Sequence, residues 1–128
     1  MTAPFPPLWY LATPYSKHPL GHVQAYQQAC HMAASLMKAG HKLFCPIAHT
    51  HPLSSVAGLV GDHDFWMAQD KPLVDRCDGL IVGLLTGWRD SKGVQQEIGW
   101  FRDAGKPVLA CAYPEFALVG FPFYQENL

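Results

Sequence analysis

The chain has 128 residues, of which 49% are hydrophobic and 15% are charged, and its formal net charge is -1. This size and composition suit one globular domain over residues 1–128, because two halves would have cores too small to be stable alone. Since there is no basic surplus and no polybasic block, we expect neither a nucleic-acid partner nor a membrane surface.

Short apolar segments alternate with segments of helical pattern along the chain. The first helical segment is rich in Ala, Gln and Met and is closed by Gly40, and the last one also ends at a glycine. Pro72 is expected to kink or restart the middle one. In chain order, the predicted elements are a strand (8–12), a helix (22–40), a strand (41–46), a helix (64–78), a strand (79–85), a helix (93–105) and a strand (106–112), followed by sixteen residues that are irregular or hold one more short element.

This alternation predicts an α/β fold with an open parallel sheet of four or five strands and helices on both faces. Right-handed crossovers and the strand order 2-1-3-4, common in flavodoxin-like and Rossmann-like folds, place a ligand crevice beyond the carboxyl ends of the first and third strands. The loops that follow these two strands, residues 13–19 and 86–93, are rich in polar and turn-forming residues.

Glu97 lies on the apolar side of its predicted helix. It comes three residues after Val94 and four before Phe101, and both of these belong to the apolar stripe. A charge on the buried side of a helix loses hydration unless something there uses it, and a carboxylate in a cleft can be a nucleophile or a base. The alternative is a helix glutamate that reaches solvent or pairs with Lys92 or Lys106.

Asp70 shows the same anomaly, because it falls on a stripe with Trp66 and Cys77. Two acidic groups that converge on one cleft suit general acid catalysis beside a nucleophile, with Asp70 as the acid and Glu97 as the nucleophile. The alternative is that Asp70 is the N-cap of a helix that restarts at residues 71–72.

A histidine-rich stretch contains His49, His51 and His63. A metal site is conceivable there, because the HxH spacing suits ligands on a strand, but residues 46–55 read as a loop. We therefore expect loop or substrate-contacting histidines and no metal. The chain has no Walker lysine pattern and no GxGxxG, so neither a nucleoside triphosphatase nor a dinucleotide enzyme is indicated.

The four cysteines stand alone, without a CxxC pair, and three of them lie in or beside apolar segments. This is the usual setting of reduced, buried cysteines, so we expect a cytoplasmic protein. The first twelve residues have no basic n-region and contain three prolines before the apolar run, which does not fit a signal peptide.

Several motifs resemble the nucleoside 2-deoxyribosyltransferase-like superfamily, which includes deoxyribosyltransferases and nucleoside 5'-monophosphate N-glycosidases. The resemblance covers about residues 8–112 and is closest to small uncharacterised members with a GW-x-x-S-x-G signature. The matching motifs are YLATPYS (10–16), Asp70 followed by CDGLIV (77–82), and GW-x-x-S-x-G-x-x-x-E-x-G (87–99) followed by AGKPVLA (104–110).

The resemblance implies that Glu97 attacks the anomeric carbon of a sugar and forms a glycosyl-enzyme ester, and that Asp70 protonates the leaving base. It implies no cofactor. It also implies a sugar site lined by Tyr10 and by the segment Thr13, Pro14, Tyr15 and Ser16, although the family often has glycine where Thr13 and Pro14 stand. Aromatic residues of the two crevice loops, Tyr15 and Trp88, could stack on the base.

Ser91 and Gly93 match family positions beside the sugar 5' group. Monophosphate glycosidases tend to carry serine at the first of these positions, whereas an aspartate there would repel a phosphate. Ser91 therefore favours a nucleoside 5'-monophosphate, but a shift of one residue would place Asp90 there and restore the nucleoside pattern. The other alternative is that Ser91 only caps the helix.

These observations predict cleavage or transfer of an N-glycosidic bond in a nucleoside or nucleoside 5'-monophosphate. One alternative is a catalytically silent nucleotide-binding or sensing module, and a less favoured one is a metal-dependent hydrolase built on the histidine cluster. The resemblance also implies a homo-oligomer, a dimer or larger, in which a neighbouring subunit completes each pocket. The aromatic stretch 113–125 is a candidate contact, and the alternative is a tail packed on its own domain.

Overall fold

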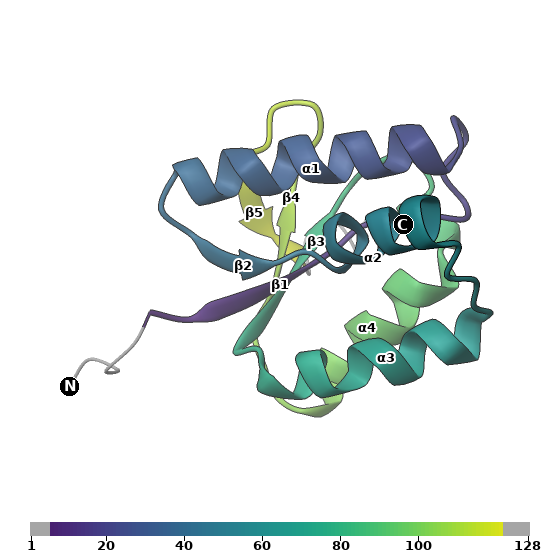
Figure 1. Ribbon diagram of the computed structural model, residues 1–128. Coiled ribbons are helices and arrows are strands. Elements are labelled where there is room, and N and C mark those ends of the chain that lie inside the picture. The colour runs from purple at the N-terminus through teal and green to yellow at the C-terminus, as the bar shows by residue number, and fades with distance from the viewer. Residues whose placement is uncertain (1–5, 122–128) are drawn as a thin grey trace.

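A five-stranded sheet forms the centre of the computed structural model, which describes residues 6–121 (Figure 1). The spatial order β2-β1-β3-β4-β5 confirms the predicted order, with β5 as the additional short element. Neighbouring strands are parallel, except that β5 runs antiparallel to β4. The strands are β1 (Leu8–Ala12), β2 (Lys42–Phe44), β3 (Gly79–Gly83), β4 (Val108–Cys111) and β5 (Leu118–Gly120).

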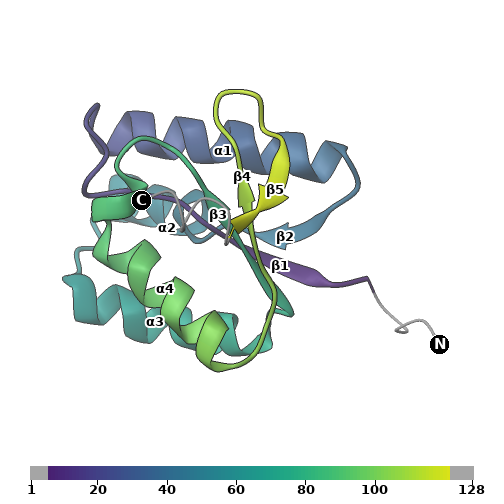
Figure 2. The same ribbon diagram turned by 180° about the vertical axis from the view of Figure 1, so that it is seen from behind.

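Helices cover both faces of this sheet, as Figures 1 and 2 show. Alternate side chains of the central strands point to opposite faces, so Tyr10 and Leu80 pack beneath α3 and α4, whereas Leu11 and Ile81 pack beneath α1. None of the helices within residues 6–121 has the length and hydrophobicity that crossing a membrane requires. The helices are α1 (His22–Lys38), α2 (Pro46–Ala57), α3 (His63–Arg76), α4 (Lys92–Asp103) and the single 3-10 turn η1 (Trp88–Asp90).

Helix α2 was not expected, because its sequence reads as a loop, and that prediction is wrong. Pro46 occupies the first turn, where its missing N–H needs no partner and its fixed φ favours the helix. Ile47 and Ala48 then pack against the core on the α1 face, and Gly58 ends the helix in a left-handed conformation. Tertiary packing thus outweighs the unfavourable composition, including an internal Pro52.

Helix α3 continues through Pro72, so of the two predicted effects of this proline, a kink or a restart, the restart is wrong. Its N-cap is Asp62, whose carboxylate accepts a hydrogen bond from the backbone N–H of Phe65 at 2.8 Å. Asp70 therefore lies within a continuous helix and is not an N-cap.

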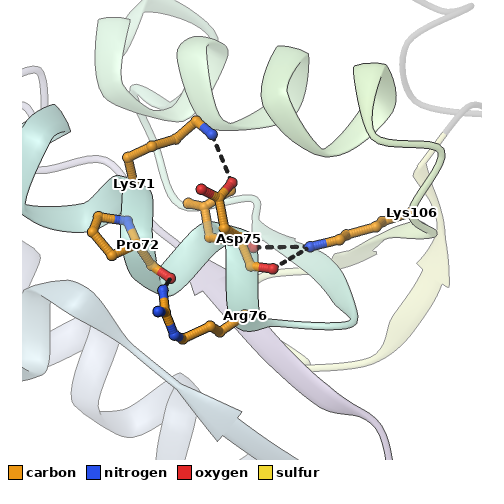
Figure 3. Close-up of polar contacts among 6 residues, drawn as sticks. Lys71, Pro72, Asp75, Arg76 and Lys106 are labelled. Carbon is orange, nitrogen blue, oxygen red and sulfur yellow. Dashed lines mark hydrogen bonds and ion pairs between the residues drawn. The ribbon is translucent and has the colours of Figure 1, made fainter.

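Cationic side chains satisfy carbonyl groups at the C-terminal end of α3 (Figure 3). Lys106 donates from Nζ to the carbonyl oxygens of Val74 and Asp75 at 3.1 and 3.0 Å, and Arg76 donates to that of Pro72 at 3.0 Å. Positive charge here also complements the helix dipole. The helix that carries Asp70 is thus tied to the segment that leads into β4.

The four cysteines are free thiols, and three of them, Cys45, Cys77 and Cys111, are buried. Burial raises the pKa of each of these three thiols to about 11, so they stay protonated and unreactive at neutral pH. This agrees with the reduced, buried setting that their sequence neighbours predict.

Candidate functional site

A cavity of about 540 Å³ opens where the strand order predicts a crevice. Both crevice loops line it, through Thr13 and residues 15–17 on one side and residues 91–93 on the other. Helix α2, the connection 59–62 and the first half of α3 complete the wall. This volume lies in the range of small-molecule sites.

The two crevice loops are packed directly against each other. Gly87 has φ of 97°, and a Cβ at this position would collide with the carbonyl oxygen of Lys17. The next residue, His18, is buried and accepts at Nδ1 from the backbone N–H of Leu20 at 3.1 Å, so its Nε2 donates to Gln28 Oε1 at 2.6 Å. These contacts fix the loop positions before any ligand binds.

Glu97 lies on the buried stripe of α4 and lines the cavity. Its side chain is only 5% exposed, and its Oε2 accepts a hydrogen bond from the Tyr10 hydroxyl on β1. It therefore neither reaches solvent nor pairs with Lys92 or Lys106, which was the ordinary alternative. The Tyr10 hydroxyl fixes the orientation of the Glu97 carboxyl group.

Burial sets the protonation of this pair. It raises the pKa of Glu97 to about 8, while the hydrogen bond from Tyr10 lowers that pKa and the nearby Asp70 carboxylate raises it. Burial also raises the pKa of Tyr10, as do the charges of Glu97 and Asp70, so the phenol remains a hydrogen-bond donor.

Asp70 reaches the same cavity from α3 and is 7% exposed. Burial raises its pKa to about 6, while hydrogen bonding to Tyr10 and the charge of His49 lower it. Between about pH 6 and pH 8, the pair of Asp70 and Glu97 therefore holds one proton, which the higher pKa places mainly on Glu97. Two carboxyl groups that hold one proton are suited to acid and nucleophile chemistry.

The N-terminal end of α4 faces the cavity beside this pair. Ser91 is the N-cap of α4, and its Oγ accepts a hydrogen bond from the backbone N–H of Val94 at 3.3 Å. The predicted capping role of Ser91 is thus confirmed. Its hydroxyl proton is still available to a ligand. Lys17, Lys92 and Gly93 also line this part of the wall. A helix N-terminus with two lysines suits an anionic group.

The remaining predicted site residues divide into two groups. Thr13, Tyr15 and Ser16 line the cavity, and the Thr13 Oγ1 is buried without a hydrogen-bond partner among the described residues. Trp88 and Asp90 do not line it and border a separate shallow depression.

Trp88 is buried against a core residue. Its ring packs edge-on against Phe121 with the centroids 5.7 Å apart, and the Arg89 guanidinium lies 5.3 Å from the Trp88 centroid. Trp88 is therefore not placed to stack on a ligand in the cavity.

The sequence allowed for substrate-contacting histidines in the histidine-rich stretch but did not predict that a helix, α2, would form part of the wall. Ile47, Thr50 and His51 line the cavity from this helix, and His22 does so from the start of α1. The histidine-rich stretch was the sequence feature that could have revealed this part of the wall, but it was interpreted as a loop. Within residues 6–121, no three His, Cys, Asp or Glu side chains are arranged to hold a metal ion, although His51 and His63 both line the cavity.

Comparison with known families gives one match. The family described as a domain of unknown function, DUF1937, matches residues 8–113, which is most of the chain and includes both cavity carboxyl groups. Among curated proteins, no match is found.

Proposed function

We propose that this chain, which belongs to the DUF1937 family, cleaves or transfers the N-glycosidic bond of a nucleoside or nucleoside 5'-monophosphate. The observation that carries the proposal is the pair of buried carboxyl groups, Glu97 and Asp70, which meet in one cavity beside the Tyr10 hydroxyl. A pair of carboxyl groups is the usual apparatus of glycosidic chemistry, and the resemblance to deoxyribosyltransferases assigns the same two residues.

In the proposed reaction, substrate binding shifts the proton of the pair from Glu97 to Asp70, and the ionised Glu97 then attacks the anomeric carbon while the bond to the base breaks. Asp70 donates its proton to the leaving base. Water, or a second base in a transfer reaction, then displaces the sugar from the Glu97 ester, and the proton of the attacking group returns to Asp70. The Glu97 carboxylate also stabilises the oxocarbenium-like transition state.

A 5'-phosphate fits the N-terminal end of α4. The Ser91 hydroxyl, the Gly93 backbone N–H and the cations Lys17 and Lys92 would meet it there. Because Ser91 caps the helix, Ser91→Ala is expected to lower stability by about 1 kcal/mol and also to lower kcat/KM for a monophosphate more than for its parent nucleoside. A wild-type kcat/KM for the nucleoside that equals or exceeds that for the monophosphate would falsify the proposal that the site binds a 5'-phosphate.

The deciding experiment is base release by the purified protein from a panel of nucleosides and nucleoside 5'-monophosphates. We expect the wild-type protein to release the base from at least one of these compounds and Glu97→Gln to release it from none. If Glu97→Gln releases the base at the wild-type rate, Glu97 is not the nucleophile.

One observation favours a second candidate, a binding module without turnover. The raised pKa of Glu97 keeps this group mostly protonated at neutral pH in the empty cavity, and a protonated carboxyl is a poor nucleophile. Tight monophosphate binding without free base after long incubation would support this candidate.

We also propose that the chain forms a dimer or larger homo-oligomer. Val56 on α2 and Val60, which lines the cavity, are 86% and 87% exposed, and such apolar surface favours a contact. The predicted contact at 113–125 is less favoured, because β5 and Phe121 pack on their own domain, while residues 122–125 lie outside the described residues. Light scattering at micromolar concentration tests this, and a fully active monomer would contradict it.

A further inference from the structure

Four aromatic rings form a connected array along the α1 and α2 side of the cavity. His22 stacks on Tyr15 with the ring centroids 4.2 Å apart, and Tyr26 stacks on His51 at 4.3 Å. The Tyr15 hydroxyl joins the two stacks, because it lies 2.7 Å from Nδ1 of His51. Three of the four residues, all except Tyr26, line the cavity. The proposed chemistry gives this array no role.

The hydrogen bond between Tyr15 and His51 couples the direction of donation to the imidazole tautomer. Burial raises the pKa of Tyr15, so the phenol keeps its proton and is able to donate it to Nδ1, while its oxygen is also able to accept from an Nδ1–H. A neutral imidazole that accepts at Nδ1 carries its own proton on Nε2. Within residues 6–121, the hydrogen bond recorded for the His51 ring is the one at Nδ1, and Nε2 is not one of the buried polar atoms that lack a partner, so it stays accessible. The stacked Tyr26 ring restricts rotation of the imidazole, so this donor has a fixed direction.

We propose that His51, oriented by Tyr15, recognises the leaving base by donating from Nε2 to an acceptor on the base edge. The identity of the ligand rests on the proposed function. The other parts of the cavity have other roles, because Glu97 and Asp70 meet the bond that breaks and the end of α4 meets the sugar 5' group. On the α2 side, away from these two parts, His51 offers an imidazole N–H held within an aromatic array. A flat, uncharged base is the component of a nucleotide that matches it.

Selectivity follows from this arrangement. A base that presents a ring nitrogen or carbonyl oxygen to Nε2 gains a hydrogen bond. A base that presents an amino group there places donor against donor and leaves both unpaired, and such a mismatch is discriminated strongly in a site built for a hydrogen bond. His51 is therefore assigned as a specificity-determining residue and Tyr15 as its positioning residue.

The binding test uses the four common ribonucleoside 5'-monophosphates and ribose 5-phosphate, which lacks a base. His51→Leu keeps a side chain of similar bulk and removes the donor, so the Kd of the best monophosphate should rise about tenfold, as expected for one lost hydrogen bond. The Kd of ribose 5-phosphate should stay unchanged. His51→Gln, which restores an N–H donor, should recover part of the affinity. His31→Gln, at an exposed position on α1, is the matched control and should bind like the wild type.

A parallel loss of affinity for ribose 5-phosphate would overturn the proposal, and so would a failure of all four monophosphates to bind. A protein that binds monophosphates through His51 but releases no base would contradict the proposed function and leave this inference standing.

The second measurement reads the tautomer directly. Imidazole nitrogen shifts from NMR of the ligand-free protein should show the proton of His51 on Nε2, and Tyr15→Phe should give a mixture of tautomers. A proton on Nδ1 in the wild-type protein would overturn the role of Tyr15. This test needs only the wild-type chain if the variant does not fold.

Discussion

Glu97→Gln should make the folded protein more stable while abolishing turnover. The pKa of Glu97 is raised from 4.5 to about 8, so the native state prefers the protonated carboxyl whereas the unfolded chain releases the proton above about pH 4.5. The stability from the protonated form is thus fully present below about pH 4.5 and is lost as the pH rises towards 8. Glutamine resembles the protonated carboxyl and never ionises, so the variant escapes this loss.

The size of the effect follows from the two pKa values, 4.5 and about 8. Each pKa unit corresponds to about 1.4 kcal/mol, so the wild-type protein loses on the order of 5 kcal/mol by pH 8 and above. At pH 7, most of the native Glu97 is still protonated and the loss is about 3 kcal/mol. For a domain of this size, that corresponds to a Tm higher by roughly 10 °C in the variant.

The assay is urea and thermal unfolding of the wild type and the variant from about pH 5 to about pH 9. Glu115→Gln is the matched control, because it makes the same chemical change at an exposed residue, and its free energy of unfolding should follow that of the wild type. If Glu97→Gln is no more stable than the wild type near pH 8, burial does not raise the free energy of the carboxylate, and the reasoning fails.

Three further outcomes are expected. The kcat/KM of the wild type should be highest between about pH 6 and pH 8, where Asp70 and Glu97 share one proton, and a flat profile would argue against the pair. Asp70→Asn should lower kcat more than it raises KM, because an amide binds a base but donates no acidic proton; kinetics equal to the wild type would contradict this. Gly87→Ala should lower the free energy of unfolding by about 1–3 kcal/mol through its positive φ and its collision with Lys17, and an unchanged Tm would count against the loop contact.

The strands and their order could be predicted because a parallel sheet covered on both faces needs continuous apolar runs. The two carboxyl groups could be predicted for a related reason: Glu97 and Asp70 interrupt apolar helix stripes, and such an interruption is visible in one sequence. The structure adds the contact between Glu97 and Tyr10, which are 87 positions apart in sequence. No local pattern contains that contact.

Helix α2 and the position of Trp88 could not be predicted, because both depend on distant contacts. Pro46 is the last residue of the strand predicted at 41–46, but in the structure it begins α2. Whether a proline ends one element or begins the next depends on what the following residues pack against. Trp88 belongs to a crevice loop, yet its ring is directed to Phe121, at the far end of the sequence. The loop in which a residue lies predicts which end of the sheet it occupies, but it does not predict where its side chain points.

Helix α2 packs mainly on α1 and β1, whereas α3 and α4 pack on each other. The carboxyl groups come from α3 and α4, and the aromatic array comes from α1, α2 and the loop before α1. Under the proposed function, selectivity and reactivity would therefore lie on separate elements and could be redesigned separately. A small combinatorial library at residues 50, 51 and 54 would alter one side of the cavity and leave the contact between Tyr10 and Glu97 intact. New substrates could be selected from such a library without re-optimising catalysis.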